Sequence, residues 1–178
     1  SPSKGEDVNP AKGLTRLNDG RVDRSGEYFI AGGFYGDCKG TKMKVFRCHQ
    51  DSDGGLIHKA IIDNVEVTNS ICWSPDGCTM YFADSPTQSI HAFDYKSGQI
   101  SENRLVFDKV IDSHSVPDGS TVDSEGYIWN ADWRGGHDTG MVRRIDPETG
   151  EVVFVVNLPD RTSQVTCCCC GGKDLDIL

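Results

Sequence analysis

The sequence repeats itself about every 50 residues, and this repeat restricts the folds that the chain can adopt. Three segments align: VDRSGEYFIAG at 22–32, SPDGCTMYFAD at 74–84 and VDSEGYIWNAD at 122–132. Each combines an Asp-containing turn that closes on a glycine with a short run of aromatic and apolar residues. The turn glycines lie 51 and 49 residues apart, at Gly26, Gly77 and Gly126. We therefore expect each repeat to be one structural unit built on a turn and a strand.

A second motif follows each copy of the first, at 43–57, 89–100 and 141–152. In each, a strand pattern leads into an Asp or Gly turn and a returning strand, which is typical of a β-hairpin. A unit of about 50 residues with some four short strands has the size of a β-propeller blade, whereas a β-sandwich gives no reason for such a repeat. We expect strands near 27–32, 43–48, 79–84, 89–94, 127–131, 141–146 and 151–157.

The length of the chain bears on how much of a ring it can form. At this repeat length, 178 residues make roughly three to four blades. A propeller is stable because its ring closes, and an open end leaves a sheet unpaired. The sequence therefore predicts an all-β chain: a single domain, 1–178, that is a partial β-propeller and a fragment of a larger ring with its N-terminal and C-terminal blades missing.

The charge of the chain argues against some partners. Asp and Glu number 27 against 18 Lys and Arg, which gives a net charge of −9. Such a chain repels phosphate backbones and shows no basic stripe, so we expect no nucleic-acid partner. The longest apolar run, 152–156, is far shorter than the roughly 20 residues that span a bilayer, so we also expect no membrane partner.

Eight cysteines bear on the compartment, and four of them form the run Cys167 to Cys170. Four consecutive cysteines cannot easily cross-link a fold. The C-x-x-C spacing of Cys167 and Cys170 permits zinc in principle, but no second pair follows. We interpret the cysteines as small buried thiols of a reduced, cytoplasmic protein.

Three polar segments lie between the predicted strands, and we expect them to be loops: RLNDG at 16–20, TNSICWSPDG at 68–77 and VPDGSTVD at 116–123. Together with the tail NLP at 157–159 and CCGGK at 169–173, their order and spacing resemble the regucalcin, senescence-marker and gluconolactonase family (SMP-30/gluconolactonase/LRE-like). The resemblance runs from about Gly13 to Leu175.

The resemblance implies a six-bladed propeller with one divalent metal ion at the centre of the ring, at the mouth of a pocket for a sugar lactone. Two of the implied metal ligands fall on Asn69 and Asp118, and the third, a Glu, would lie upstream of Ser1. The implied substrate-binding residues fall on Arg16 and Asn18.

Two positions depart from the family pattern. A second pocket Glu of the family aligns near Gly36 and Asp37, where Asp37 could partly substitute. The family's Asn-Gly at the metal position is Asn69-Ser70 here.

The residues themselves support part of this interpretation. Asn69 and Asp118 lie 49 residues apart, about one repeat, so they occupy similar places in successive blades. Their oxygens suit a hard cation, Ca²⁺ first, with Mg²⁺, Mn²⁺ or Zn²⁺ also possible. Pro-Asp-Gly is also a turn signal by itself, which leaves a structural role for Asp118 open. We interpret four other acids as turn residues: Asp19, Asp23, Asp76 and Asp123.

The sequence thus predicts a divalent-metal-dependent sugar lactone hydrolase of the gluconolactonase type. The metal would polarise the lactone carbonyl for attack by water, with Asp118 as the catalytic base and no covalent intermediate. One alternative is a non-enzymatic calcium-binding regulatory protein, and another is a related hydrolase of organophosphates or a luciferin-derived product. We expect the 178-residue chain alone to be little active without the upstream Glu. The lactone and the oligomeric state are left open.

Overall fold

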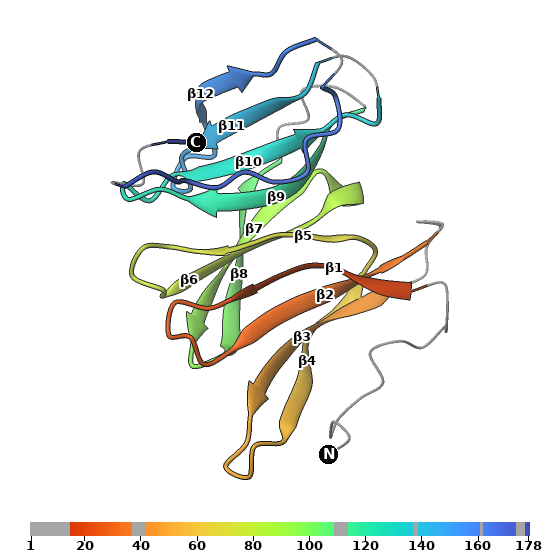
Figure 1. Cartoon of the computed structure of the whole chain (residues 1–178), viewed down its shortest axis with the longest axis vertical. Helices are drawn as coiled ribbons and strands as arrows, with labels where there is room; N and C mark the ends of the chain where they lie inside the picture. The colour runs from red at the N-terminus through yellow and green to blue at the C-terminus, as the bar shows by residue number, and fades with distance from the viewer. Residues whose placement is uncertain (1–14, 37–41, 109–113, 137–138, 161, 174–176) are drawn as a thin grey trace.

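The structure, a computed structural model, describes residues 15–36, 42–108, 114–136, 139–160, 162–173 and 177–178. These residues form three four-stranded antiparallel sheets in which each strand pairs with the next one along the chain (Figure 1). The first sheet holds β1 (Thr15–Val22), β2 (Phe29–Tyr35), β3 (Met43–Gln50) and β4 (Leu56–Val65). The second holds β5 (Thr68–Trp73), β6 (Thr79–Asp84), β7 (Ser89–Lys96) and β8 (Gln99–Phe107). The third holds β9 (Val116–Val122), β10 (Ile128–Trp133), β11 (Met141–Ile145) and β12 (Val152–Asn157).

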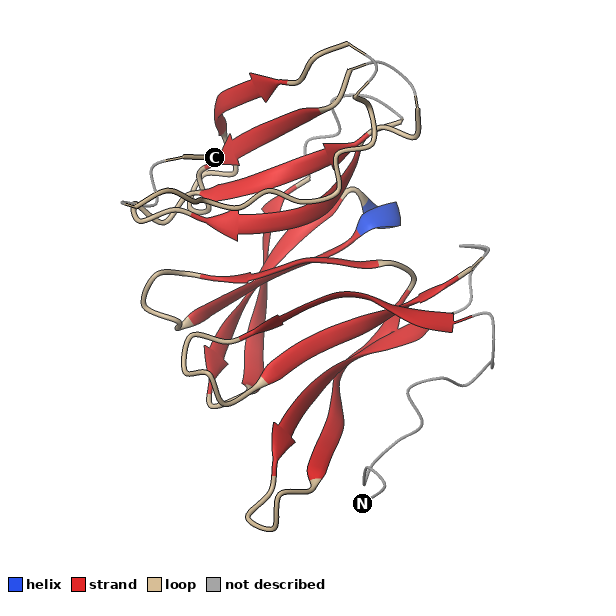
Figure 2. Ribbon diagram, in the orientation of Figure 1, coloured by secondary structure: helices blue, strands red, loops and turns tan. Residues whose placement is uncertain are grey.

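The all-β propeller prediction is confirmed, with three blade-like sheets among the described residues. All seven predicted strands are present. The described part contains a single short 3₁₀ turn, η1 (Ser85–Thr87), as Figure 2 shows. No helix among the described residues has the length and apolar character needed to cross a bilayer.

The repeated glycines close the turns that connect the first two strands of each sheet. Gly26, Gly77 and Gly126 have positive φ values of 80°, 74° and 91°, a conformation that favours glycine. In each turn the glycine N–H donates to the carbonyl three residues earlier, for example from Gly26 to Asp23 at 3.1 Å. The sequence repeat is therefore a repeat of one turn geometry.

Acidic side chains fix all three turns, as predicted, and in the second the Asp76 carboxylate accepts from Ser74 Oγ and the Cys78 N–H. The Asp23 carboxylate accepts hydrogen bonds from Ser25 Oγ and the Tyr28 N–H. The Asp123 carboxylate accepts from the Glu125 and Tyr127 N–H groups. Each carboxylate thus satisfies backbone donors of its own turn.

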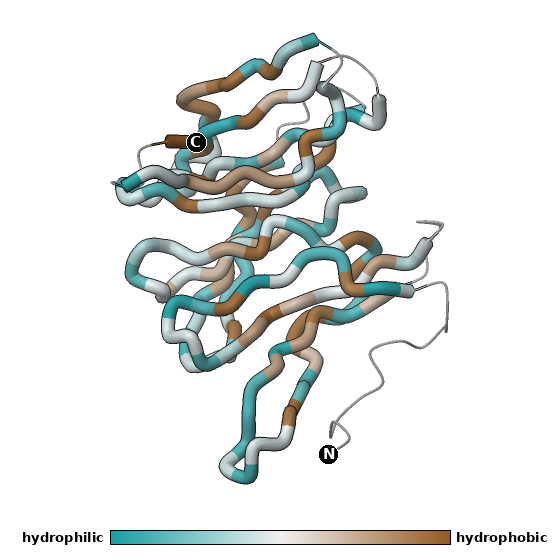
Figure 3. The backbone as a smooth tube through the Cα atoms, viewed as in Figure 1, coloured by the Kyte–Doolittle hydropathy of each residue, from teal (hydrophilic) through white to brown (hydrophobic). Residues whose placement is uncertain are grey.

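The apolar core lies between the sheets. One cluster joins the first and second sheets, with Ile30 and Val45 packed against Trp73 and Met80. A second cluster joins the second and third sheets through Tyr81, Ile90, Ile128 and Ile145, among others. In Figure 3 the apolar segments follow the strands, and the tip of the β3–β4 hairpin is hydrophilic. The second sheet, which packs on both neighbours, is buried along the whole of β5.

One part of the prediction is wrong. The polar segments at 16–20, 68–73 and 116–122 are not loops but strands, β1, β5 and β9, the first strand of each sheet. They form the sides on which the sheets approach one another, since β5 contacts both β1 and β9. Their polar residues therefore belong to the strands at which neighbouring sheets meet and not to surface loops.

Candidate functional site

The predicted site residues lie on the three inner strands. Arg16 and Asn18 are at the start of β1, Asn69 is the second residue of β5 and Asp118 is the third residue of β9. All four line one cleft of about 790 Å³. The rest of the lining is Asp19, Phe34, Val67, Ser85, Pro86, Val116, Gly119, Trp133, Thr166 and Cys167. The topology therefore brings residues 102 positions apart in the chain, from Arg16 to Asp118, to the same cleft.

A chain of hydrogen bonds orders the side chains from the first sheet to η1. Arg16 donates to Asn18 Oδ1, and Asn18 Nδ2 donates to Asn69 Oδ1 at 3.2 Å and to the Thr68 carbonyl at 2.8 Å. Asn69 Nδ2 in turn donates to Ser85 Oγ at 2.7 Å. These partners fix the Asn69 amide with its nitrogen toward η1 and its oxygen toward Asn18. The amide oxygen is thus the group that Asn69 offers to the cleft.

Ser70 connects the strand of Asn69 to the strand of Asp118. Its φ of 59° lies in the left-handed region, which a glycine would adopt without strain. Its hydroxyl donates to the Asp118 carbonyl at 2.6 Å and accepts from Ser120 Oγ and Asn130 Nδ2 at 3.0 and 3.2 Å. The serine at the family's glycine position therefore keeps the glycine-like backbone and adds a tie to β9.

Asp118 is a carboxylate in a weakly solvated place. Burial raises its pKa to about 6; the Gly119 N–H lowers the pKa, the nearby Asp19 charge raises it, and the Arg16 charge lowers it. Pro117, Asp118 and Gly119 lie within β9, so the turn that Pro-Asp-Gly could have formed is not present. A carboxyl group with this pKa is close to the balance between base and acid at neutral pH.

Asp19 is a cleft residue that the sequence interpretation assigned to a turn. It lies on β1 beside Asn18, and its carboxylate accepts from the Ile71 N–H at 2.9 Å and the Gly20 N–H at 2.8 Å. Burial raises its pKa, while these two N–H groups and the Arg21 charge lower it. Asp19 therefore ties β1 to β5 and adds negative charge beside Asp118. Its position in RLNDG, next to a predicted substrate-binding residue, was the available signal.

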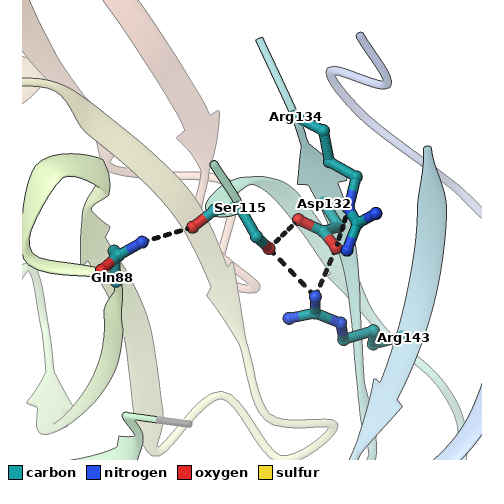
Figure 4. A network of polar contacts seen from close by, with 5 residues as sticks. All are labelled: Gln88, Ser115, Asp132, Arg134 and Arg143. Atoms are coloured by element: carbon teal, nitrogen blue, oxygen red, sulfur yellow. Dashed lines mark hydrogen bonds and ion pairs between the residues drawn. The ribbon is translucent and has the colours of Figure 1, made fainter. Parts of the chain in front are cut away.

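A buried ionic network supports the start of β9 behind the cleft (Figure 4). Asp132 accepts from Ser115 Oγ and from Arg143, and it pairs with Arg134 at 3.4 Å. Arg143 also donates to Ser115 Oγ at 3.0 Å, and Gln88 donates to the Ser115 carbonyl at 2.8 Å. Since Ser115 directly precedes β9, this network holds the strand that carries Asp118.

The oxygen atoms of Asn69 and Asp118 in the cleft are of the type that a hard divalent cation prefers. Among the described residues, Asn69 Oδ1 accepts the 3.2 Å bond from Asn18, and the Gly119 N–H beside the Asp118 carboxylate donates to the Thr166 carbonyl at 2.8 Å. Both groups therefore keep oxygen lone pairs for a further partner. No group of three or more His, Cys, Asp and Glu side chains in the described ranges is arranged to hold a metal ion. Asn69 and Asp118 thus place two candidate oxygen donors at the cleft, whereas Ca²⁺ takes six to eight oxygens.

Asp37 and the cysteines were the remaining residues with a predicted role. Asp37, the expected substitute for the pocket Glu, lies outside the described residues. Of the cysteine run, Cys167 lines the cleft, and Cys168 Sγ donates to the Trp129 carbonyl at 3.3 Å. The seven described cysteines are free thiols, but Cys72 alone among them is buried, so the prediction of buried thiols is wrong for the exposed Cys78, Cys167 and Cys169.

Comparison with known proteins agrees with the family resemblance seen in the sequence. Residues 5–178 match the model of the SMP-30/Gluconolactonase/LRE-like region. Regucalcin of Oryctolagus cuniculus is 39% identical over 173 residues, covering 94% of this chain and 54% of the relative.

Two solved structures superpose on the chain with TM-scores of 0.76. A luciferin-regenerating enzyme, 30% identical, covers 95% of this chain with 54% of its own. A calcium-binding protein, regucalcin, from Agrobacterium tumefaciens is 27% identical and covers 91% of this chain with 51% of its own. The chain spans about half the length of these relatives, and it belongs to the SMP-30/gluconolactonase/LRE-like family.

Proposed function

We propose that this chain carries part of the active site of a divalent-metal-dependent sugar lactone hydrolase, with Asp118 as the catalytic base. The observation that carries the proposal is the cleft itself. It places the half-buried Asp118 carboxylate beside a guanidinium and two amides, on the inner strands of three sheets. Membership of a family that includes gluconolactonases supports the same reaction class.

Asn69 Oδ1 and the Asp118 carboxylate would hold the metal ion, with Ca²⁺ preferred because both donors are hard oxygens. When bound, the ion would supply Lewis acidity toward the lactone carbonyl. The neighbouring Asp19 would add negative charge beside the ion, and one backbone N–H donates to each of its two carboxylate oxygens.

The other residues bind and orient the substrate. Arg16 presents N–H groups at one side of the cleft, where they can donate to sugar hydroxyls and fix the carbonyl. The two amide N–H groups of Asn18 already donate to Thr68 and Asn69, so Asn18 would act by accepting from Arg16 and orienting it. Phe34 and Trp133 line the same cleft and offer apolar surface to the sugar ring. Asp118 would accept the proton of the attacking water, so that hydrolysis needs no covalent enzyme intermediate.

Two alternatives rest on specific observations. The rabbit relative and one of the solved structures are named regucalcin, and the latter is described as a calcium-binding protein, which favours a calcium-binding role. The similarity to a luciferin-regenerating enzyme favours a different substrate, such as an organophosphate or a luciferin-derived product. The free thiols support a reducing, cytoplasmic location for each alternative.

The experiment pairs metal binding with turnover. Calorimetry of the 178-residue chain with Ca²⁺, Mg²⁺, Mn²⁺ and Zn²⁺ should show one site, weakened by Asn69→Ala and by Asp118→Asn but not by the exposed control Asp94→Asn. Hydrolysis of a sugar lactone panel, with and without chelator, is measured on the same samples.

Binding with metal-dependent hydrolysis supports the lactonase. Because we expect little activity from the 178-residue chain alone, binding without hydrolysis supports the regulatory alternative only when a longer chain that carries the upstream Glu is also inactive. Hydrolysis limited to a phosphotriester panel supports the other hydrolase. Metal affinity that both cleft variants leave unchanged would show that the assigned ligands are wrong.

A further inference from the structure

Ser85, the first residue of η1, lines the cleft and is only 4% exposed. Its hydroxyl makes two hydrogen bonds. It accepts from Asn69 Nδ2 at 2.7 Å, and it donates to the Pro117 carbonyl at 2.7 Å. Since Pro117 directly precedes Asp118 on β9, one buried oxygen connects the Asn69 side chain to the strand of Asp118.

The direction of these two bonds follows from the groups that make them. The Pro117 carbonyl can only accept, so the single proton of the Ser85 hydroxyl is used there. Toward Asn69 the hydroxyl oxygen can then only accept. Asn69 must therefore present its amino nitrogen to Ser85, which turns Oδ1 the other way, toward Asn18 and the cleft.

The opposite end of this chain of hydrogen bonds requires the same direction. Arg16 has only donors, and it donates to Asn18 Oδ1, so Asn18 presents its amino nitrogen to Asn69 Oδ1. A flipped Asn69 amide would place two amino groups together on the Asn18 side. On the Ser85 side it would place two oxygens together without a proton between them. Both contacts are repulsive, so the chain permits one orientation of the Asn69 amide.

The backbone of η1 holds Ser85 in this place. The Ser85 N–H donates to the Val67 carbonyl at 3.0 Å, directly before β5, and the Gln88 N–H donates to the Ser85 carbonyl at 3.0 Å. The Gln88 side chain donates to the Ser115 carbonyl at 2.8 Å, directly before β9 (Figure 4). The short 3₁₀ turn is therefore tied to both inner strands that carry the candidate oxygen donors.

We propose that Ser85 is a positioning residue of the candidate site. It holds the Asn69 amide so that Oδ1 and not Nδ2 faces the cleft, and it ties this amide to the strand of Asp118. The inference rests on the proposed function in one respect, that Asn69 Oδ1 holds the metal ion. The contacts join β5, η1 and β9 directly, so they need no residue outside the 178-residue chain.

The orientation matters because the two ends of an amide differ. The amide oxygen has lone pairs for a cation, whereas the amide nitrogen only donates. An Asn69 side chain that turns freely would offer its oxygen for part of the time, and the apparent affinity for a cation falls with that fraction.

The first measurement is made without metal. Nuclear magnetic resonance of the 178-residue chain follows the exchange of the Asn69 side-chain amide protons with water, and loss of the signal in Asn69→Ala assigns it. Ser85→Ala should speed this exchange about 3- to 10-fold, as expected for the loss of one hydrogen bond. Ser89→Ala is the matched control and should leave the exchange unchanged. Ser89 is also buried, and its hydroxyl contacts Thr87 and His91 outside the cleft.

The second measurement is a titration with Ca²⁺, followed in the same spectra, which detect weak binding. Ser85→Ala should weaken Ca²⁺ binding about 3- to 10-fold, and Ser89→Ala should not. The substitution is then repeated in an Asn69→Asp chain. Both ends of that side chain are oxygens, so orientation no longer limits binding and Ser85→Ala should change the affinity less than about 2-fold. A serine that only supports the fold would weaken binding equally in both backgrounds.

Unchanged proton exchange in Ser85→Ala would overturn the inference. So would an equal loss of Ca²⁺ affinity in both backgrounds, or no loss where Asn69→Ala weakens binding. Calcium binding that is absent, or that Asn69→Ala leaves unchanged, would instead contradict the ligand assignment of the proposed function, and proton exchange alone would then decide the inference. Circular dichroism checks the fold, and Ser85→Cys, with its weakly hydrogen-bonding thiol, replaces Ser85→Ala if that variant is unfolded.

Discussion

Ser70 Oγ lies 2.6 Å from the backbone carbonyl oxygen of Asp118 and donates a hydrogen bond to it across the boundary between the second and third sheets. The residue that makes this bond has a backbone φ of 59°, which serine adopts at a cost. The position of the Asp118 strand therefore depends on a side chain from the neighbouring sheet.

Substitution of Ser70 should separate the contribution of its hydroxyl to stability from that of its left-handed backbone conformation. Ser70→Ala leaves buried groups of Ser120 and Asn130 with fewer partners and should lower the unfolding free energy by about 1–3 kcal/mol. Ser70→Gly loses the same bonds but relieves the left-handed strain, so it should be less destabilising than alanine by about 1 kcal/mol. Chemical denaturation measures both, and an alanine variant as stable as the glycine variant would contradict the strain argument.

Asp132 should be essential for stability because it is a buried charge with charged partners. Asp132→Ala removes the carboxylate partner of the buried Arg143 charge. Removing one partner of a buried ion pair typically lowers the unfolding free energy by about 3–5 kcal/mol. The matched control is Asp94→Ala, which removes the exposed partner of Arg104 and should change the unfolding free energy by less than about 1 kcal/mol. Equal effects of the two substitutions in urea unfolding would show that the network of Figure 4 adds no stability.

Asp123 should make stability depend on pH in the acid range. Burial alone would raise its pKa, but hydrogen bonds from Arg144, Trp129 and Tyr127 outweigh burial and lower it. A carboxyl group with a lowered folded-state pKa stabilises the protein above its unfolded pKa, and this contribution is lost as the pH falls through the folded pKa.

Asp123→Asn should therefore lower the melting temperature at pH 7, and its difference from the unaltered chain should shrink below about pH 4. Thermal melts between pH 2 and pH 7 measure this. Asp53→Asn, at the exposed tip of the β3–β4 hairpin, should show no such trend. A constant difference for Asp123→Asn at every pH would contradict a role for the carboxylate charge.

Arg16 should matter for ligand affinity. Its charge faces the cleft beside Asn18, and it also lies 4.5 Å from the centre of the Phe34 ring. Loss of a charge-assisted hydrogen bond of about 1.5–3 kcal/mol in Arg16→Ala should raise the dissociation constant of a sugar lactone or its acid about 10- to 100-fold. Calorimetry measures this without requiring turnover. Arg24→Ala, outside the cleft, is the control, and an equal loss there would indicate a general charge effect.

The middle strands of the sheets could be predicted because their sequence obeys simple patterns. Segments such as 79–84 and 89–94 combine apolar runs with Asp and Gly turns, and their predicted bounds agree with β6 and nearly with β7. The returning strands β4 and β8 were expected only as the second halves of hairpins. Both lie at the outer edge of a sheet, where exposed polar residues weaken the strand pattern.

The inner strands could not be recognised from the sequence because polar cleft residues and irregular pairing disrupt the alternating pattern of a strand. Asn18, Asn69 and Asp118 give these segments the composition of loops, yet they are strand residues that face a cleft. The pairing of β1 and β5 is also irregular, between Leu17 and Gly20 and between Asn69 and Cys72. Such bulges break the alternation of faces from which strands are predicted.

The candidate site itself was predicted from family resemblance more than from pattern. Spacing indicated that Asn69 and Asp118 share a place in the repeat, and the structure puts both in one cleft. Asp19 was assigned to a turn because an Asp-Gly pair favours turns. Its bond to the Ile71 N–H, 52 residues away, could not be read from local sequence.

The strand order within each sheet has a consequence for how the chain acquires its structure. Every sheet pairs β-strands that are consecutive in the sequence, so all ladder hydrogen bonds close over short loops. During synthesis, the first sheet can be completed before the ribosome has produced the strands of the second, and each finished sheet then offers a surface for the next. The slow step is therefore expected to be the docking of one preformed sheet on another, and the inner strand β5, which contacts both neighbours, is where that docking begins.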